Sequence, residues 1–501
     1  MAIRQKELGD FQTPIKLSQQ VCRLLAQQGI SPTVIIEPTC GKGSFILASL
    51  EYFPQVERVF GLEINADHLH RLKQELSRRI SSDKVEIRHG DFFGVNWETI
   101  LAEFSEPLLI IGNPPWVTNS TLGQLNSQNL PEKTNFQNHS GLDALTGKSN
   151  FDISEWMLLH LIQLISGQDG VLAMLVKTSV ARKVLKHLWE NRSNIGQSQI
   201  YLLDGKQEFG VSVDMCLFVC NTKGNHSNQI CKVYDGVSEE TFLTTFGFND
   251  GHLVANINSY NQWKHLITTT AKHYKWRSGI KHDAAKVMEL TQHTTCYKNS
   301  LGETCILEND YLYPLLKSSD IAKGAVEHPR RWVLVPQSYV GESTAHIKHN
   351  APKTWDYLNT HKTFFDKRKS SIYKNKPQFS IFGIGDYSFA LWKVAISGLY
   401  KNLKFVVVGP YEDKPVMLDD TCYFIPCTSQ KEANFLVSLL NSQVAKEFFS
   451  SFIFWDSKRP VTAHILGQLD ILLLAQELDV ESEIKEYVHT KKVNQPSLFP
   501  L

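Results

Sequence analysis

The stretch VIIEPTCGKGSF, residues 34–45, decides how the chain begins to fold. A short β-branched run ends in an acid, two glycines follow, and an apolar segment of helical character comes next. A strand that leads through a glycine loop into a helix is typical of a parallel α/β sheet. Gly41 and Gly43 let the backbone approach a ligand closely, and the start of the helix offers free N–H groups. The stretch therefore predicts a ligand site beside this turn.

The same alternation of strands and helices continues to about residue 220. It predicts a doubly wound, mostly parallel α/β sheet of the Rossmann-like kind, with its ligand beyond the carboxyl ends of the strands, where the strand order reverses. Strands are predicted at Val34–Glu37, Arg58–Glu63, Val85–Gly90, Pro107–Gly112, Gly170–Lys177, Gln199–Asp204 and Asp214–Cys220. Helices are predicted at Ser44–Tyr52, Asn65–Ile80, Asp152–Ile165 and Ala181–Glu190.

Changes in composition divide the chain into four parts. We expect the sheet domain at residues 1–225, a transitional segment at 226–278, a mixed α/β domain at 279–480 and a tail at 481–501. The polar stretch 118–150 is too long for an ordinary connection. We interpret it as a loop over the active site.

Composition narrows the class of protein. With 501 residues, 42% of them hydrophobic, the chain can bury a large core. It has neither an apolar run of roughly 18 to 20 residues nor a signal peptide, so we expect a cytoplasmic protein without membrane contact.

Nine scattered cysteines without a CxxC pair indicate reduced thiols, and we predict no metal. The net charge of +1 does not decide for or against nucleic acid, because local clustering sets the field.

The acid beside the glycine loop limits the kinds of ligand that the loop can bind. The loop lacks the third glycine of a dinucleotide fingerprint, since position 46 is Ile46, and it is not a phosphate loop. Glu37 would repel a pyrophosphate but favour a positively charged sulfonium or ammonium group. The loop therefore indicates S-adenosylmethionine.

Two further strand ends carry groups that suit a nucleoside cofactor. Glu63 follows the second strand, where a carboxylate can accept hydrogen bonds from both ribose hydroxyls. Asp91 follows the third strand, where it can accept from the adenine amine while Phe92 packs on the ring. Each residue alone reads more simply as a strand-end cap, but three successive strand ends with suitable groups favour a cofactor site.

The turn Asn113-Pro114-Pro115-Trp116 follows the apolar strand PLLIIG. An exocyclic amine on adenine is a poor nucleophile because its lone pair is delocalised into the ring. If the Asn113 side-chain oxygen and the Pro114 carbonyl accept the two amine hydrogens, the lone pair can turn towards a sulfonium methyl group. Pro115 restricts the backbone, and Trp116 offers a face for a base swung out of a duplex. A lone NPP is usually a turn, but its place at the end of the fourth strand favours catalysis.

With these motifs the chain resembles the gamma-type adenine-N6 DNA methyltransferases of restriction-modification systems, in which a catalytic domain precedes a target-recognition domain. The resemblance covers residues 8–220 through motifs and the rest more diffusely. Phe11–Pro14 resembles the amino-terminal motif, which implies that Thr13 helps to hold the methionine end of the cofactor. Phe209 falls on the aromatic that stacks on the flipped base, opposite Trp116. The resemblance implies cofactor contacts at Glu37, Glu63, Asp91 and Phe92.

Two positions depart from the family pattern. Trp116 stands where a tyrosine or phenylalanine is usual, which retains stacking. Lys177, in MLVKTS, stands where a proline is common, which leaves the geometry of that loop open.

A basic and aromatic region in the second half is predicted to grip DNA phosphates. A lysine-rich face that is merely solvated explains the same pattern equally well. The predicted DNA-binding residues are Lys367, Arg368, Lys369, Lys374, Lys376 and Lys393.

Two other functions stay open from the residues alone. One is methylation of RNA or of a protein glutamine, since amide and guanine amines present the same lone-pair problem. The other is an inactive protein that only confers DNA specificity. We expect double-stranded DNA as the binding partner and a monomeric protein. A cognate restriction endonuclease, if it exists, would act as a separate protein.

The chain ends in a polar tail that contains QPSLF, residues 495–499. Its spacing resembles short peptides that bind the bacterial DNA sliding clamp, with Gln495 as an anchor and Leu498 and Phe499 in an apolar pocket. A loosely docked or disordered tail is the simpler interpretation, because such pentapeptides recur by chance.

Overall fold

The computed structural model describes residues 11–78, 83–116, 152–224, 229–237, 241–268, 273–293 and 296–493, with side chains described to residue 487. The chain forms two compact units, residues 1–257 and 258–501. Within the described ranges, no helix combines the length and apolarity that a membrane span requires. The predicted active-site loop at 118–150 and the clamp-binding residues Gln495, Leu498 and Phe499 lie outside the described residues.

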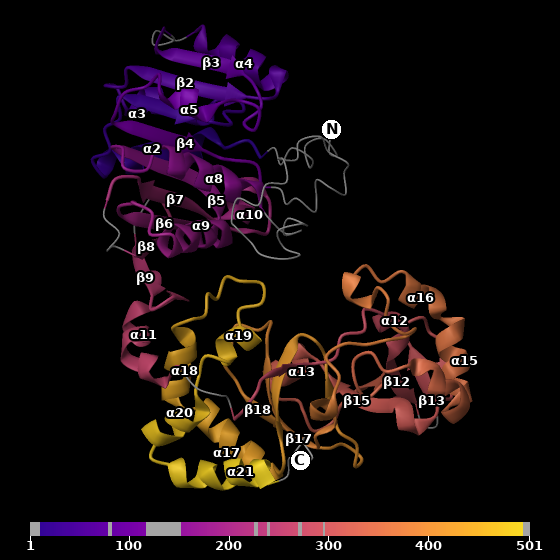
Figure 1. Cartoon of the computed structure of the whole chain (residues 1–501). Coiled ribbons are helices and arrows are strands. Elements are labelled where there is room, and N and C mark those ends of the chain that lie inside the picture. Colours follow the sequence, from indigo (N-terminus) through magenta and orange to yellow (C-terminus); the bar gives the residue numbers. More distant parts are fainter. Residues whose placement is uncertain are drawn as a thin grey trace, which may run out of the picture. The chain divides into compact units, whose positions relative to one another are not determined.

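The first unit is built on a ten-stranded sheet, as the alternation of elements predicted (Figure 1). Its strand order is β10-β9-β8-β6-β7-β5-β4-β1-β2-β3, and the run from β5 to β3 is parallel. The strands are β1 (Val34–Glu37), β2 (Arg58–Glu63), β3 (Val85–His89), β4 (Leu108–Gly112), β5 (Gly170–Lys177), β6 (Ser198–Asp204), β7 (Asp214–Asn221), β8 (Ile230–Asp235), β9 (Thr241–Asn249) and β10 (His252–Val254).

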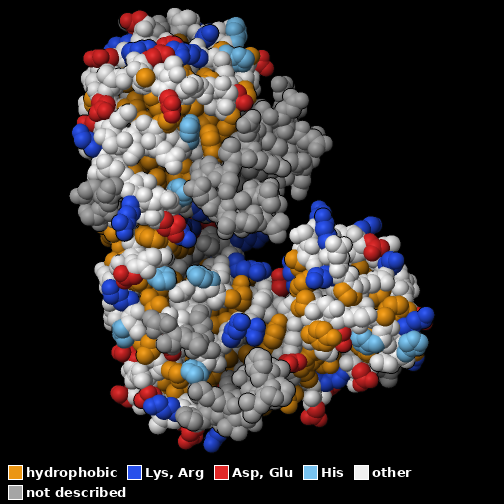
Figure 2. Space-filling model, in the orientation of Figure 1, with side chains coloured by type: hydrophobic (Ala, Val, Ile, Leu, Met, Phe, Trp, Pro, Cys, Tyr) orange, Lys and Arg blue, Asp and Glu red, His pale blue; other side chains and the backbone are white. Residues whose placement is uncertain are grey.

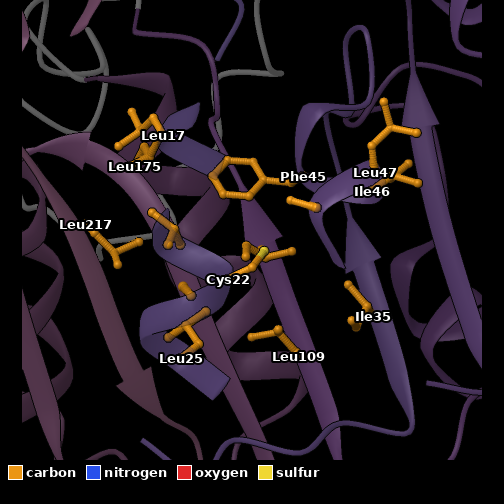
Figure 3. Packing of buried hydrophobic residues seen from close by; sticks show 14 of the residues in the cluster. Leu17, Cys22, Leu25, Ile35, Phe45, Ile46, Leu47, Leu109, Leu175 and Leu217 are labelled. Carbon is orange, nitrogen blue, oxygen red and sulfur yellow. The ribbon is translucent and has the colours of Figure 1, made fainter. Parts of the chain in front are cut away.

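Helices connect these strands and cover the sheet (Figure 1). They are α2 (Ile15–Gln27), α3 (Ser44–Tyr52), α4 (Ala66–Leu76), α5 (Trp97–Leu101), α8 (Ile153–Leu164), α9 (Thr178–Glu190) and α10 (Gly205–Phe209). Helix α2 was not predicted, and it adds an amphipathic layer to the core. Figure 3 shows Leu17, Cys22 and Leu25 of this helix beside residues of α3 and of the strands.

Strand β1 lies between β2 and β4, which is where the strand order reverses. Ile36 pairs with Ile110 of β4 and with Phe60 of β2, all in parallel register. The carboxyl ends of β1, β2 and β4 therefore meet at one edge of the sheet, where the sequence predicted the ligand.

The boundary of the first unit differs from the sequence prediction. Strands β8, β9 and β10 fall in the predicted transitional segment, yet they extend the first sheet, because β8 pairs in parallel with β6. The first unit thus continues to Ile257. Helix α11 (Ile257–Trp263) then leads into the second unit.

The second unit combines two sheets with helices, in agreement with the predicted mixed α/β domain. One sheet has the order β14-β13-β12-β16-β15-β19 and the other β11-β20-β17-β18. The strands are β11 (Arg277–Ser278), β12 (Glu289–His293), β13 (Cys296–Asn299), β14 (Thr304–Cys305), β15 (Leu312–Leu316), β16 (Arg331–Leu334), β17 (Trp392–Ser397), β18 (Val406–Val408), β19 (Met417–Leu418) and β20 (Cys422–Cys427).

The helices of the second unit fall into two groups along the chain. The first group is α12 (Ala285–Met288), α13 (Ser318–Lys323), α14 (Ile347–Asn350), α15 (Pro352–Thr360) and α16 (Lys362–Asp366). The second is α17 (Gln430–Leu440), α18 (Gln443–Ser450), α19 (Ala463–Leu466), α20 (Ile471–Glu477) and α21 (Glu481–Val493). Helix α21 occupies the start of the predicted tail, and its Tyr487 ring lies 5.8 Å from that of Phe435. The second unit therefore extends beyond residue 480.

Gly43 is a position at which the first unit requires glycine. It precedes α3 in the left-handed conformation, with φ of 79°. A Cβ atom at this position would lie 2.2 Å from Cδ1 of Leu72, which is itself buried in α4. The glycine loop and α4 can approach each other only because this Cβ is absent.

We therefore predict that Gly43→Ala destabilises the first unit more than Gly29→Ala does. Gly29 has a similar φ of 82° but open space around its missing Cβ. Both substitutions bear the left-handed strain of about 1 to 2 kcal/mol, and overpacking adds about 1 to 3 kcal/mol at Gly43 alone. Thermal and urea unfolding of the two variants measure the difference, and Leu72→Ala should relieve part of the destabilisation in Gly43→Ala. Equal destabilisation of the two variants would contradict the packing role.

Candidate active site

A cleft opens at the carboxyl ends of β1, β2, β3 and β4. Its empty space, open mouth included, measures about 1010 Å³. Eight predicted site residues line it: Thr13, Glu37, Gly41, Glu63, Asp91, Phe92, Asn113 and Pro115. Segments more than 100 positions apart in the sequence thus form one site, as the strand-end argument predicted.

The glycine loop is tied to the second strand. The Gly41 N–H donates to Glu63 Oε2 at 2.7 Å, and the Asn65 N–H donates to Glu63 Oε1 at the same distance. The Glu63 carboxylate thereby fixes the loop and the start of α4. Because each carboxylate oxygen accepts more than one hydrogen bond, these contacts are compatible with a role towards ribose hydroxyls.

Glu37 is buried at the floor of the cleft, with 3% of its surface exposed. The Ile46 N–H donates to its Oε2 at 3.2 Å. Burial raises the pKa of this carboxyl well above its ordinary value of 4.5, and the nearby Glu63 adds to the increase. A positively charged ligand in the cleft would stabilise the ionised form and lower this pKa again.

Asp91 and Phe92 close another side of the cleft. The Asp91 carboxylate accepts a hydrogen bond from the Phe93 N–H at 3.1 Å, so it also acts as a local cap. Phe92 is largely buried, and its ring packs 4.9 Å from the Trp97 ring. The Trp97 indole N–H donates to the Phe92 carbonyl at 3.0 Å, which fixes the position of this wall.

The two polar atoms of the Asn113 amide differ in their hydrogen bonding. Its Nδ2 donates to the Phe11 carbonyl at 2.8 Å and contacts Thr13 Oγ1 at 3.3 Å. Its Oδ1 is buried and has no hydrogen-bond partner among the described residues. Of the two prolines that follow, Pro114 is buried and Pro115 lines the cleft.

Trp116 and Phe209 lie together beside this turn, although neither lines the cleft. Their ring centroids are 5.1 Å apart at an interplanar angle of 69°, so the rings meet edge to face. Phe11 contacts both rings, at 5.5 and 6.5 Å. The Trp116 indole N–H donates to the Leu175 carbonyl at 3.2 Å. A base could enter between Trp116 and Phe209 only if the two rings moved apart.

Lys177 makes a contact that a proline could not make. Its Nζ lies 2.6 Å from Oδ2 of Asp152, which is buried. Asp152 also accepts from the Ser154 N–H and so caps α8, the helix whose Ile153 and Met157 line the cleft. The lysine therefore ties the end of β5 to a wall of the site.

Several lining residues were not predicted. Gln12 accepts a hydrogen bond from the Lys42 N–H at 2.9 Å and so joins the amino-terminal segment to the glycine loop. Asn65 caps α4, and His68 follows on the same helix. Gln12 stands inside the quoted motif FQTP, and Asn65 begins the helix predicted after the second strand, so both had a signal in the sequence.

The predicted DNA-binding residues differ in their surroundings. Lys367, Lys369, Lys374 and Lys376 are exposed, and Figure 2 shows blue side chains at the end of this unit where α16 lies. Arg368 is directed inward instead. Its guanidinium stacks 3.7 Å from the centre of the Tyr373 ring and donates to the Ser380 carbonyl at 2.6 Å.

The prediction for Lys393 is wrong. This lysine is 1% exposed within β17, and its Nζ donates to the Ala390 carbonyl at 2.5 Å. Burial lowers its pKa to about 7. A side chain enclosed by the sheet in this way does not reach a DNA phosphate.

The fold and the cleft define a Rossmann-like methyltransferase, and comparisons with known proteins give the family. Residues 2–184 match the family described as N-6 DNA Methylase. The chain is 45% identical to the type II methyltransferase M.NspV of Nostoc sp. over 470 residues, 94% of this chain and 97% of that protein. It is 31% identical to the type II methyltransferase M.XamI of Xanthomonas campestris pv. amaranthicola over 121 residues, 24% of this chain and 22% of that protein.

A solved structure of the type IIL restriction-modification enzyme MmeI in complex with DNA shares the fold. It matches with a TM-score of 0.54 at 13% identity, over 97% of this chain and 73% of that chain. The chain belongs to the N-6 DNA methylase family and, within it, to the type II methyltransferases. Its activity is methylation of adenine N6 in DNA, as the sequence predicted.

Burial of Glu37 predicts a pH dependence of stability in the ligand-free protein. Since the folded-state pKa is raised, the stabilising contribution is fully present below the unfolded value near 4.5 and is lost as pH rises through the folded value. Glu37→Gln removes this dependence, so its stability relative to the unmodified protein should increase with pH, by up to about 1.4 kcal/mol per pH unit. Denaturant unfolding between pH 5 and pH 8 measures the difference. The exposed Glu57→Gln serves as the control. Parallel curves for the unmodified protein and Glu37→Gln would exclude the proposed burial effect.

Proposed function

We propose that the cleft binds S-adenosylmethionine and that Asn113 presents an adenine, extruded from double-stranded DNA, for transfer to its N6. The observation that carries this proposal is the Asn113 amide oxygen, which is buried beside the cleft without a hydrogen-bond partner in the described part of the chain. A buried acceptor without a partner costs about 1 to 3 kcal/mol. Such a cost is expected where a substrate supplies the missing donor.

The cleft residues fit a cofactor that carries a positive charge and a nucleoside. Glu37 and Glu63 are acids with little exposure, and the backbone of Gly41 lies open to the cleft. We infer that Glu63 binds the ribose, that Asp91 and Phe92 hold the adenine ring and that Glu37 favours the positive end. The cofactor would supply a methyl group activated by its sulfonium.

The Asn113 oxygen acts on the nucleophile. When Oδ1 accepts one hydrogen of the adenine amine and the Pro114 carbonyl accepts the other, the nitrogen becomes pyramidal and its lone pair leaves the ring system. The amine then approaches the methyl group in the orientation needed for attack. No charged base near the amine is required, because the product nitrogen loses its extra proton to solvent after transfer.

The aromatic residues beside the turn hold the base. We infer that Trp116 and Phe209 part when the base enters and that each then contributes a stacking face. Stacking on an aromatic ring contributes about 1 to 3 kcal/mol per base, which offsets the loss of stacking in the duplex. The edge-to-face contact between the rings would be the resting arrangement.

The second unit is assigned to target recognition. Its exposed lysines around α16 would contact phosphates and thereby position the enzyme, without reading sequence. We place the enzyme in the cytoplasm, as the modification partner of a restriction endonuclease that acts separately. The similarity to M.NspV along nearly the whole chain supports this assignment.

The assignment of Asn113 predicts that Asn113→Ala loses methyl transfer while it retains cofactor binding. Loss of one preorganised hydrogen-bonding group commonly lowers the turnover rate by about 100- to 1000-fold. Transfer of a labelled methyl group to DNA and calorimetric titration of S-adenosylmethionine should be measured on the same preparation. An Asn113→Ala variant that transfers the methyl group to DNA at the normal rate would contradict the assignment.

For the lysines, we predict that changing Lys367, Lys369, Lys374 and Lys376 to Gln weakens binding to all DNA sequences. Each lysine that neutralises a phosphate should add about 0.9 to the slope of log affinity against log salt, so its replacement should reduce that slope. The matched control changes four exposed lysines on other parts of the unit: Lys286, Lys323, Lys431 and Lys458. If the two variants have equal slopes of log affinity against log salt, the four lysines belong to an ordinary solvated face and do not bind DNA.

A further inference from the structure

The contacts of the Asn113 side chain determine which way its amide nitrogen and its amide oxygen point. Its closest partner is the Phe11 carbonyl oxygen, 2.8 Å from Nδ2. A backbone carbonyl can only accept a hydrogen bond, so the amide nitrogen must face Phe11. Rotation of the amide by 180° would place two acceptors face to face. The contact with Phe11 therefore directs Oδ1 away from the amino-terminal segment, to a buried position where no described residue donates a hydrogen bond to it.

Thr13 supplies a second contact on the same side of the amide. Its Oγ1 lies 3.3 Å from Asn113 Nδ2, and a hydroxyl oxygen can accept this hydrogen bond. The amide nitrogen has two hydrogens, and Phe11 and Thr13 together can accept both. With both hydrogens engaged, the amide loses the rotational freedom that an isolated asparagine would keep.

The segment that provides these acceptors is itself anchored to the glycine loop. Ser44 Oγ donates to the Thr13 carbonyl at 2.7 Å, and the Lys42 N–H donates to Gln12 Oε1 at 2.9 Å. On its other side, the N–H of Leu17 donates to the Pro14 carbonyl at 3.0 Å, which begins α2. The segment 11–14 thus lies between the loop after β1 and the turn after β4, and it is hydrogen-bonded to both.

We propose that Thr13 and the Phe11 carbonyl are positioning groups for Asn113: they hold the amide with its oxygen towards the substrate amine. The inference rests on the proposed role of Asn113. It assigns the Thr13 hydroxyl to Asn113 and to the rate of transfer, in place of the cofactor contact that the family resemblance implies. An amide turned the other way would present N–H donors to an amine, which repels the substrate hydrogens and leaves the lone pair in the ring.

The test replaces Thr13 by Val, which keeps the branched shape and removes the acceptor, and by Ser, which keeps the acceptor. Loss of one neutral hydrogen bond predicts a fall in kcat of roughly three- to tenfold for Thr13→Val, with the affinity for S-adenosylmethionine changed less than about twofold. Thr13→Ser should recover most of the rate. The control is Thr33→Val, because the Thr33 hydroxyl donates to the Pro107 carbonyl at 3.2 Å, at the far ends of the same two strands.

Single-turnover transfer, cofactor titration and thermal unfolding of each variant separate the outcomes. A Thr13→Val variant with a normal kcat, or one that loses cofactor affinity in proportion to its rate, overturns the positioning role. Loss of transfer in Asn113→Ala together with a normal rate in Thr13→Val would overturn this inference alone. Normal transfer in Asn113→Ala would instead overturn the proposed function.

Discussion

The parallel pairing of β1 between β2 and β4 is the constraint on which the site depends. It brings the ends of three strands to one edge, so that Glu37, Glu63 and Asn113 surround a single cleft. The strands that enforce this register are almost fully buried, and α2 and α3 cover one face with apolar side chains. The core can therefore hold polar groups at the strand ends in positions that they would not adopt in isolation.

Those polar groups are unfavourable for stability and useful for chemistry. A buried acid, and an amide oxygen that has no hydrogen-bond partner within the described ranges, both raise the free energy of the folded, ligand-free protein. In the proposed function each meets a group that the reaction brings: a positive charge for Glu37 and an amine hydrogen for Asn113. The hydrogen bonds of Asn113 Nδ2 tie the turn after β4 to the amino-terminal segment, and the proposed function assigns the amide oxygen to the substrate.

Local sequence patterns were sufficient to predict most strands of the first sheet and the residues at the strand ends that line the cleft. Strands β1, β2 and β5 begin and end where predicted, because β-branched apolar runs end abruptly at polar or glycine residues. Helix α2 was missed although Leu17, Val21 and Leu24 recur at helical spacing after Pro14. Lys393 was misjudged because basic residues were counted along the chain, whereas β17 is buried along nearly its whole length. The contact between Phe11 and Asn113 joins residues 102 positions apart, and no local pattern encodes it.

The identity of the methylated base tests the central claim most directly. Purified protein should be incubated with DNA that contains all short sequence contexts and with labelled S-adenosylmethionine, and the nucleosides should then be separated and identified by mass spectrometry. The Asn113 turn predicts methylation of an exocyclic amine, and the match to the N-6 DNA methylase family predicts that this amine is adenine N6. The product should therefore be N6-methyladenine, confined to one recognition sequence when the same DNA is sequenced for modified bases. Label found in N4-methylcytosine or 5-methylcytosine, or in no base although the cofactor binds, would contradict it.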